Sequence, residues 1–238
     1  MGIKRGSITT SIVTDGLVFN MDAANRASYV PDTITSYDTT NALTSGSLSG
    51  VTFVPSTGSG VWNFDGIDDV IDISDRLLFD STNPCTNESW VFLDEYNPAF
   101  PGVCRLKTDQ STGFMIFFST YSGYDGINFG SNSNFLTAGT QGDISGDIIG
   151  SWKHIVLVYD GVSKSTLSSY KLYIDGNNTS IQTVGSYNPT PNSNKLGFGN
   201  VATTEWNGKI ANFHLYNRAL SSTEVLHNYN ALKGRFGL

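Results

Sequence analysis

Basic residues and long apolar runs are scarce in this 238-residue sequence. Its 14 Lys and Arg face 21 Asp and Glu, which leaves a formal net charge of −7. Nucleic acids and anionic membranes are bound by clustered positive charge, so we expect neither as a partner. No stretch reaches the roughly 18 apolar residues of a membrane-spanning helix, and the polar start MGIKRGS does not resemble a signal peptide. The sequence predicts a soluble, unsecreted protein.

Cysteine is also scarce. Cys85 and Cys104 are too few for a disulfide framework and lack the spacing of a zinc site. If residues 88–95 and 103–107 form a hairpin, Cys104 lies opposite Leu93 and not opposite Cys85. We therefore expect two unbridged thiols.

Short segments rich in β-branched and aromatic residues recur along the chain, separated by Gly, Asn, Asp, Ser and Pro. This pattern predicts one all-β domain, a sandwich or barrel. The predicted strands are residues 17–22, 60–64, 70–73, 89–94, 113–119, 154–160, 170–175, 180–185, 195–199 and 209–216. Residues 31–59 are dominated by Thr, Ser, Gly and Asp, which predicts a long loop with one short strand near Val51–Val54.

The two ends of the chain differ from the strand-rich middle. Ser221 and Glu224 form a capping-box pattern before an apolar i, i+4, i+7 repeat, which predicts a helix over about residues 222–233. Residues 1–14 predict an extended arm, in which Lys4 and Arg5 are candidates for attachment to a neighbouring protein. The alternative for this arm is a frayed terminus.

Several segments resemble the laminin-G-like, concanavalin A-like lectin/glucanase domain. They are DGLVFNMDAAN (15–25), FDGIDD (64–69), SWKHIV (151–156), YIDG (173–176), GKIA (208–211) and YNRALS (216–221). The resemblance implies a jelly-roll sandwich of two antiparallel sheets over residues 15–238, including the C-terminal helix. The start of this region and the final YNALKGRFGL are similar to domains in structural proteins of tailed bacteriophages, which implies a location in the virion.

Catalysis of the family's glucanase type requires carboxyl groups that face each other across a glycosidic bond. The glutamates of this chain are Glu88, Glu95, Glu205 and Glu224. Asp94 and Glu95 are adjacent, which would point them to opposite faces of a strand. The histidines, His154, His214 and His227, form no metal-binding pattern. We expect no catalytic residues and no enzyme.

A calcium site is one candidate. Asp65, Asp68 and Asp69 offer three carboxylates within five residues, and Gly66 lets the chain bend. Calcium prefers such oxygen ligands from a flexible turn. The alternative is a hairpin turn in which Asp65 and Gly66 set the backbone and the other two carboxylates are solvated.

A glycan site is the second candidate, because aromatic rings that stack on sugars need polar neighbours to fix the orientation. Tyr121, Tyr124 and Trp206 lie on predicted loops beside Ser, Gly, Asp, Glu and Asn. The alternative for each is a buried loop anchor. The remaining tryptophans lie in or beside strands and are expected in the core: Trp62, Trp90 and Trp152.

These observations favour a non-enzymatic surface protein of a tailed-phage virion, a capsid or tail decoration that adheres weakly to glycans. Its partners would be other virion proteins and copies of the same chain. The alternative is a free-standing carbohydrate-binding or adhesion module of a kind that depends on calcium in some relatives.

Overall fold

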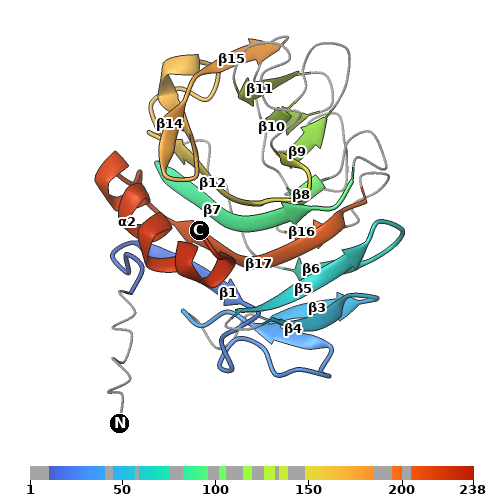
Figure 1. The fold of residues 1–238 in the computed structure, drawn as a ribbon. Helices are drawn as coiled ribbons and strands as arrows, with labels where there is room; N and C mark the ends of the chain where they lie inside the picture. Colours follow the sequence, from blue (N-terminus) through green and yellow to red (C-terminus); the bar gives the residue numbers. More distant parts are fainter. Residues whose placement is uncertain are drawn as a thin grey trace.

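The structure is a computed structural model that describes residues 11–40, 45–56, 59–74, 83–95, 102–105, 115–119, 126–131, 134–138, 148–184, 195–199 and 205–238. Two antiparallel sheets pack face to face, and a C-terminal helix lies against one of them (Figure 1). The predicted all-β jelly-roll sandwich with one short C-terminal helix is therefore confirmed. In the described ranges, no helix has the length and hydropathy needed to cross a membrane.

The eight-stranded sheet contains the most buried strands, and each lies antiparallel to its neighbours. Its order is β14 (Asn177–Thr179), β13 (Tyr170–Ile174), β12 (Trp152–Tyr159), β7 (Cys85–Leu93), β17 (Asn207–Tyr216), β5 (Ser59–Asp65) and β4 (Thr52–Ser56), with β1 (Leu17–Asp22) also paired to β17. β12, which is apolar over most of its length, lies between β13 and β7. A β-bulge interrupts the register of β17 with β7 between Ile210 and Asn212.

The nine-stranded sheet completes the sandwich. Its order is β15 (Ile181–Val184), β11 (Asn134–Ala138), β10 (Gly126–Ser131), β9 (Met115–Ser119), β8 (Gly102–Arg105), β16 (Lys195–Gly199), β6 (Val70–Ser74), β3 (Ser45–Ser49) and β2 (Thr35–Tyr37). A short 3-10 helix, η1 (Leu167–Ser169), precedes β13.

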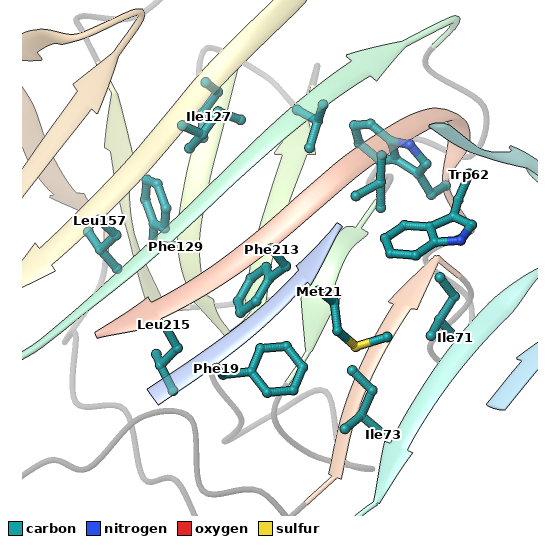
Figure 2. Packing of buried hydrophobic residues seen from close by; sticks show 14 of the residues in the cluster. Phe19, Met21, Trp62, Ile71, Ile73, Ile127, Phe129, Leu157, Phe213 and Leu215 are labelled. Carbon is teal, nitrogen blue, oxygen red and sulfur yellow. The ribbon is translucent and has the colours of Figure 1, made fainter. Parts of the chain in front are cut away.

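The hydrophobic core lies between the inner faces of the two sheets (Figure 2). Phe19, Phe213 and Leu157 come from the eight-stranded sheet and are at most 1% exposed. Ile71 and Phe129 come from the nine-stranded sheet and are fully buried. Because alternate residues of a strand point to opposite faces, every second residue of the eight-stranded sheet points away from this core.

Two sequence predictions about pairing are wrong. Residues 31–59 are not one long loop with a single strand, because they contain β2, β3 and β4. The proposed hairpin of residues 88–95 with 103–107 does not form, since β7 and β8 belong to different sheets. The Cα position of Cys104 therefore pairs with Ile116 and Phe198, not with Leu93. Runs of Ser, Gly and Thr do not exclude strands when the neighbouring strands supply the pairing.

The C-terminal helix forms as the sequence predicts. α2 (Ser222–Leu232) begins after Ser221, whose side chain accepts a hydrogen bond from the Glu224 amide, while the Glu224 carboxylate accepts one from the Ser221 amide. It continues into the 3-10 helix η2 (Lys233–Phe236). Together α2 and η2 cover part of the outer face of the eight-stranded sheet.

The N-terminal arm is described only from residue 11, so Lys4 and Arg5 lie outside the described residues. Residues 11–14 lie against α2 and β17. The Val13 amide donates to Asn228 Oδ1 over 2.8 Å, and the Val13 carbonyl accepts from the Tyr216 hydroxyl over 3.0 Å. This part of the predicted arm is bound to its own domain.

Candidate functional site

The turn between β5 and β6 brings the three predicted aspartates together. Gly66 bends the chain with a φ of +75°, and Asp65 Oδ1 accepts a hydrogen bond from the Ile67 amide over 2.8 Å. Asp69 Oδ2 accepts one from the Asp65 amide, also over 2.8 Å. Asp65 and Gly66 therefore set the backbone, as the alternative to a calcium site predicts. The hairpin of that alternative is wrong, because β5 and β6 lie in different sheets, and so is its solvated Asp69, which is buried.

This turn supplies some of the oxygen ligands that a hard cation such as calcium needs. One ligand atom from each of Asp65, Asp68 and Asp69 lies within 4.8 Å of the others. Asp69 is only 5% exposed, and burial together with the charges of Asp65 and Asp68 raises its pKa, although the Asp65 amide lowers it. A bound cation would stabilise the ionised carboxylates. Calcium takes roughly six to eight oxygen ligands, of which this turn supplies a part.

Two more carboxylates lie beside this turn, directly after β7. Both carboxylate oxygens of Asp94 accept from Lys209 Nζ, over 2.9 and 2.8 Å, and Glu95 Oε1 accepts from Asn207 Nδ2 over 2.7 Å. Asn207 is the β17 partner of Asp65. This end of the eight-stranded sheet therefore carries a concentration of negative charge.

The structure describes one of the three predicted glycan-binding aromatic residues, Trp206. Trp206 is 1% exposed, so its assignment to an exposed sugar platform is wrong and the buried-anchor alternative applies. Tyr121 and Tyr124 lie outside the described residues. Trp62 and Trp90 are buried as expected, but Trp152 is only partly buried.

Sequence reasoning missed a buried polar cluster on the outer face of the eight-stranded sheet, under α2. Glu88 is 1% exposed, and its Oε1 lies 3.2 Å from His154 Nε2 and 3.3 Å from His214 Nδ1. Its Oε2 accepts from Asn228 Nδ2 over 2.7 Å. Asn228 Nδ2 also donates to the hydroxyl of Tyr216 over 3.0 Å. The cluster thus joins β7, β12, β17 and α2.

The neighbouring groups favour an ionised Glu88 carboxylate in this cluster, and burial favours a protonated Tyr216 hydroxyl. Burial alone would raise the pKa of Glu88, but hydrogen bonds and charge from His154 and His214 outweigh burial and hold that pKa below its ordinary range. Burial and the neighbouring Glu88 charge raise the pKa of Tyr216. A carboxylate sealed in this way cannot reach a substrate, so the cluster stabilises the fold and fastens the helix.

A small cavity lies elsewhere on the same sheet. It has a volume of about 230 Å³ and is lined by residues that include Val158, Asp160, Ser169, Lys171 and Leu220. Pockets that enclose small-molecule ligands usually measure roughly 300–1,000 Å³. Its size therefore does not favour it as a ligand site.

Solved structures with a similar fold include domains of glycan-active and receptor-binding proteins. Domain 4 of AbnA, a GH43 extracellular arabinanase from Geobacillus stearothermophilus solved in complex with arabinotriose, superimposes with a TM-score of 0.64 at 15% identity, covering 90% of this chain and 98% of that domain. A Trypanosoma rangeli sialidase mutant with trans-sialidase activity gives a TM-score of 0.62 at 15% identity, covering 96% of this chain and 35% of its own. The binding domain of botulinum neurotoxin serotype D gives 0.60 at 13% identity, covering 91% of this chain and 52% of its own.

Identities this low show the shared fold alone, and this chain spans about half of the toxin domain and about a third of the sialidase. The comparison with curated proteins returned no match. The sequence profile of the concanavalin A-like lectin/glucanases superfamily matches residues 64–226, which is more than half of the chain and includes β6 to β17. The chain therefore belongs to the concanavalin A-like lectin/glucanase superfamily.

Proposed function

We propose that this chain is a non-enzymatic glycan-binding domain on the surface of a tailed-phage virion. The observation that carries the non-enzymatic part is that three carboxylates of the described residues are engaged in structural contacts. Glu88 is sealed under α2, Glu224 caps that helix and pairs with Arg218, and Asp94 is held by Lys209. A glycosidase instead needs two carboxyl groups free to act on one glycosidic bond.

Glycan binding is supported by the superfamily and by one neighbour in particular. The arabinanase domain that this chain covers almost completely was solved with arabinotriose, and it is one domain of a larger enzyme. Fold similarity by itself does not fix function. It does favour a sugar over other small molecules as the first class of ligand to test.

The virion location is supported by the resemblance of both ends of the chain to structural proteins of tailed phages. Display in many copies would make a weak single site useful, because simultaneous attachment multiplies affinity without new contacts. Quantitative mass spectrometry of purified particles tests the location. A fixed copy number that survives washing is expected, and particles without the chain would overturn the location but not the glycan binding.

A glycan array tests the binding with the purified full chain, displayed singly and on a multivalent carrier. We expect signals that strengthen with multivalent display. An array that stays silent in both formats would overturn the glycan-binding proposal. Release of reducing ends from any bound glycan would overturn the non-enzymatic part.

A free-standing, calcium-dependent adhesion module is the second candidate, favoured by the cluster of Asp65, Asp68 and Asp69. Repeating the array and the particle wash with a calcium chelator separates the two. Binding lost on chelation, with no copies on particles, would support the second candidate. Binding and copy number that both survive chelation would support the first.

A further inference from the structure

One row of side chains crosses the outer face of the eight-stranded sheet without being buried. The register places Trp152 of β12 opposite Phe92 of β7, Phe92 opposite Lys209 of β17, and Lys209 opposite Asn63 of β5. Asn63 pairs in turn with Thr52 of β4. All five residues are partly or fully exposed. We call this set, Trp152, Phe92, Lys209, Asn63 and Thr52, the uncovered row.

These side chains share the outer face because their neighbours in sequence point into the core. Val91 and Leu93 flank Phe92 in the core cluster, and Trp62 and Phe64 flank Asn63 in the same cluster. Alternation along a strand then directs Phe92 and Asn63 outward. The row crosses five adjacent strands, which at about 4.8 Å per strand spacing gives a length of about 19 Å.

The adjacent row shows why this one is distinctive. The next row on the same face lies two positions away along each strand. Its side chains are at most 3% exposed because α2 and η2 cover them, and they are those of His154, Trp90, Ala211 and Val61. The cover ends at Phe236, whose ring lies 4.3 Å from Trp90 and 4.5 Å from Trp152 between centroids. Trp152 is therefore packed by Phe236 on one side and partly exposed to solvent.

The uncovered row combines two packed aromatic rings with the ammonium group of Lys209, which Asp94 holds in place. The rings of Phe92 and Trp152 meet edge to face with centroids 5.6 Å apart, and Lys209 Nζ lies 4.4 Å from the centre of the Phe92 ring. Asp94 holds the same ammonium through both carboxylate oxygens. Aromatic side chains beside a few placed donors and acceptors are the usual lining of small-molecule sites.

The charges select the kind of sugar. The ammonium of Lys209 is balanced by Asp94. Beyond the row, the same strand ends carry the exposed carboxylates of Glu95, Asp65 and Asp68. This surplus of negative charge repels sialylated and other anionic glycans, and it repels nucleic acid for the same reason.

We infer that the uncovered row is the binding surface for a neutral, extended oligosaccharide. This inference rests on the proposed glycan-binding function and names the surface and the chemical class of its ligand. A sugar ring stacks on Trp152, hydroxyl groups of the next units bind Lys209 and Asp94, and the chain continues toward Asn63 and Thr52.

The test measures binding of arabinotriose, xylotetraose, cellotetraose and sialyllactose to the full chain by isothermal titration calorimetry. Trp152→Ala should weaken binding of the neutral probe about tenfold or more, as expected when a large aromatic contact is truncated. Tyr37→Ala is the matched control, because Tyr37 is an aromatic residue 46% exposed on the other sheet. The control should leave the dissociation constant unchanged.

Lys209→Met is the second variant, for use if Trp152→Ala unfolds at a lower temperature than the wild type. The Lys209→Met substitution should also weaken binding of the neutral probe.

Each outcome of these measurements has a separate meaning. Wild-type binding that neither variant weakens would overturn the uncovered row but leave glycan binding intact. Stronger binding of sialyllactose would overturn the neutral class, and dimers in sedimentation that Trp152→Ala dissociates would assign the row to self-association. A wild-type chain that binds none of these probes or any array glycan would overturn both proposals.

Discussion

Replacement of Asn228 by alanine tests whether the buried cluster fastens the C-terminal helix. The Asn228 side chain is fully buried and makes three hydrogen bonds. Nδ2 donates to Glu88 Oε2 over 2.7 Å and to the Tyr216 hydroxyl over 3.0 Å, and Oδ1 accepts from the Val13 amide over 2.8 Å. Asn228→Ala removes all three and leaves a buried carboxylate oxygen without this donor.

The expected loss of stability follows from the kinds of hydrogen bond that the substitution removes. A hydrogen bond to a charged group contributes about 1.5–3 kcal/mol and each neutral one about 1 kcal/mol. The higher helix propensity of alanine stabilises the variant by about 0.5 kcal/mol and offsets part of this loss. We therefore expect Asn228→Ala to lower the free energy of unfolding by about 3–4.5 kcal/mol, measured by urea denaturation followed by tryptophan fluorescence.

Asn230→Ala is the matched control, because Asn230 is exposed on the same helix. It should change the free energy of unfolding by no more than about 0.5 kcal/mol. A double-mutant cycle with Glu88→Gln isolates the contact between Asn228 and Glu88 and should give a coupling energy of about 1 kcal/mol or more. Equal stabilities of the two alanine variants, or a coupling energy of zero, would refute the role assigned to the cluster.

Three further predictions concern the helix cap and the aspartate turn. Arg218 and the backbone cap lower the pKa of Glu224 to about 2 from 4.5, so the stability contributed by its charge is present above pH 4.5 and is lost as the pH falls toward 2. The difference in melting temperature between wild type and Glu224→Gln should therefore narrow across that range, and a constant difference would contradict the ion pair. Calcium should raise the melting temperature of the wild type and of Asp72→Asn but not of Asp69→Asn, and equal shifts in all three would exclude the turn as the site. Gly50 has a φ of +75° and leaves no room for a Cβ beside the Asp69 carboxylate, so Gly50→Ala should cost at least about 1–2 kcal/mol in chemical denaturation and also weaken any calcium effect. A Gly50→Ala variant as stable as the wild type would show that the contact is not tight.

The fold could be predicted where local patterns carry the information. Alternating or continuous apolar residues gave β1 (Leu17–Asp22) and β16 (Lys195–Gly199) with the correct bounds. Asp175 and Gly176 form the tight turn that joins β13 to β14, with φ values of +52° and +78°, and turn-forming residues of this kind can be recognised in the sequence. The capping box of Ser221 fixed the start of α2.

The turn of Asp65, Asp68 and Asp69 could be predicted because its residues are local in sequence. The buried Glu88 cluster and the uncovered row could not, because their residues meet only through long-range pairing. The sequence around Glu88 is Thr86-Asn87-Glu88-Ser89, which has the composition of a loop. It is nevertheless a buried strand, since its partners come from β12, β17 and α2, which all lie far from it in the sequence. Trp152 and Trp206 have opposite exposures to those expected, and nothing in their immediate sequence distinguishes them.

The position of the C-terminal helix connects these two features of the outer face. A sheet face can be polar and buried only where another element supplies hydrogen-bond partners, and Asn228 does so for Glu88. Where η2 ends, at Phe236, the same face becomes accessible, and its aromatic residues lie beside the charged pair of Lys209 and Asp94. The helix therefore divides one sheet face into a sealed part that stabilises the domain and an accessible part. Loss of the Asn228 contacts should disturb both parts, whereas substitutions of Trp152 should act on ligand binding with a smaller effect on stability.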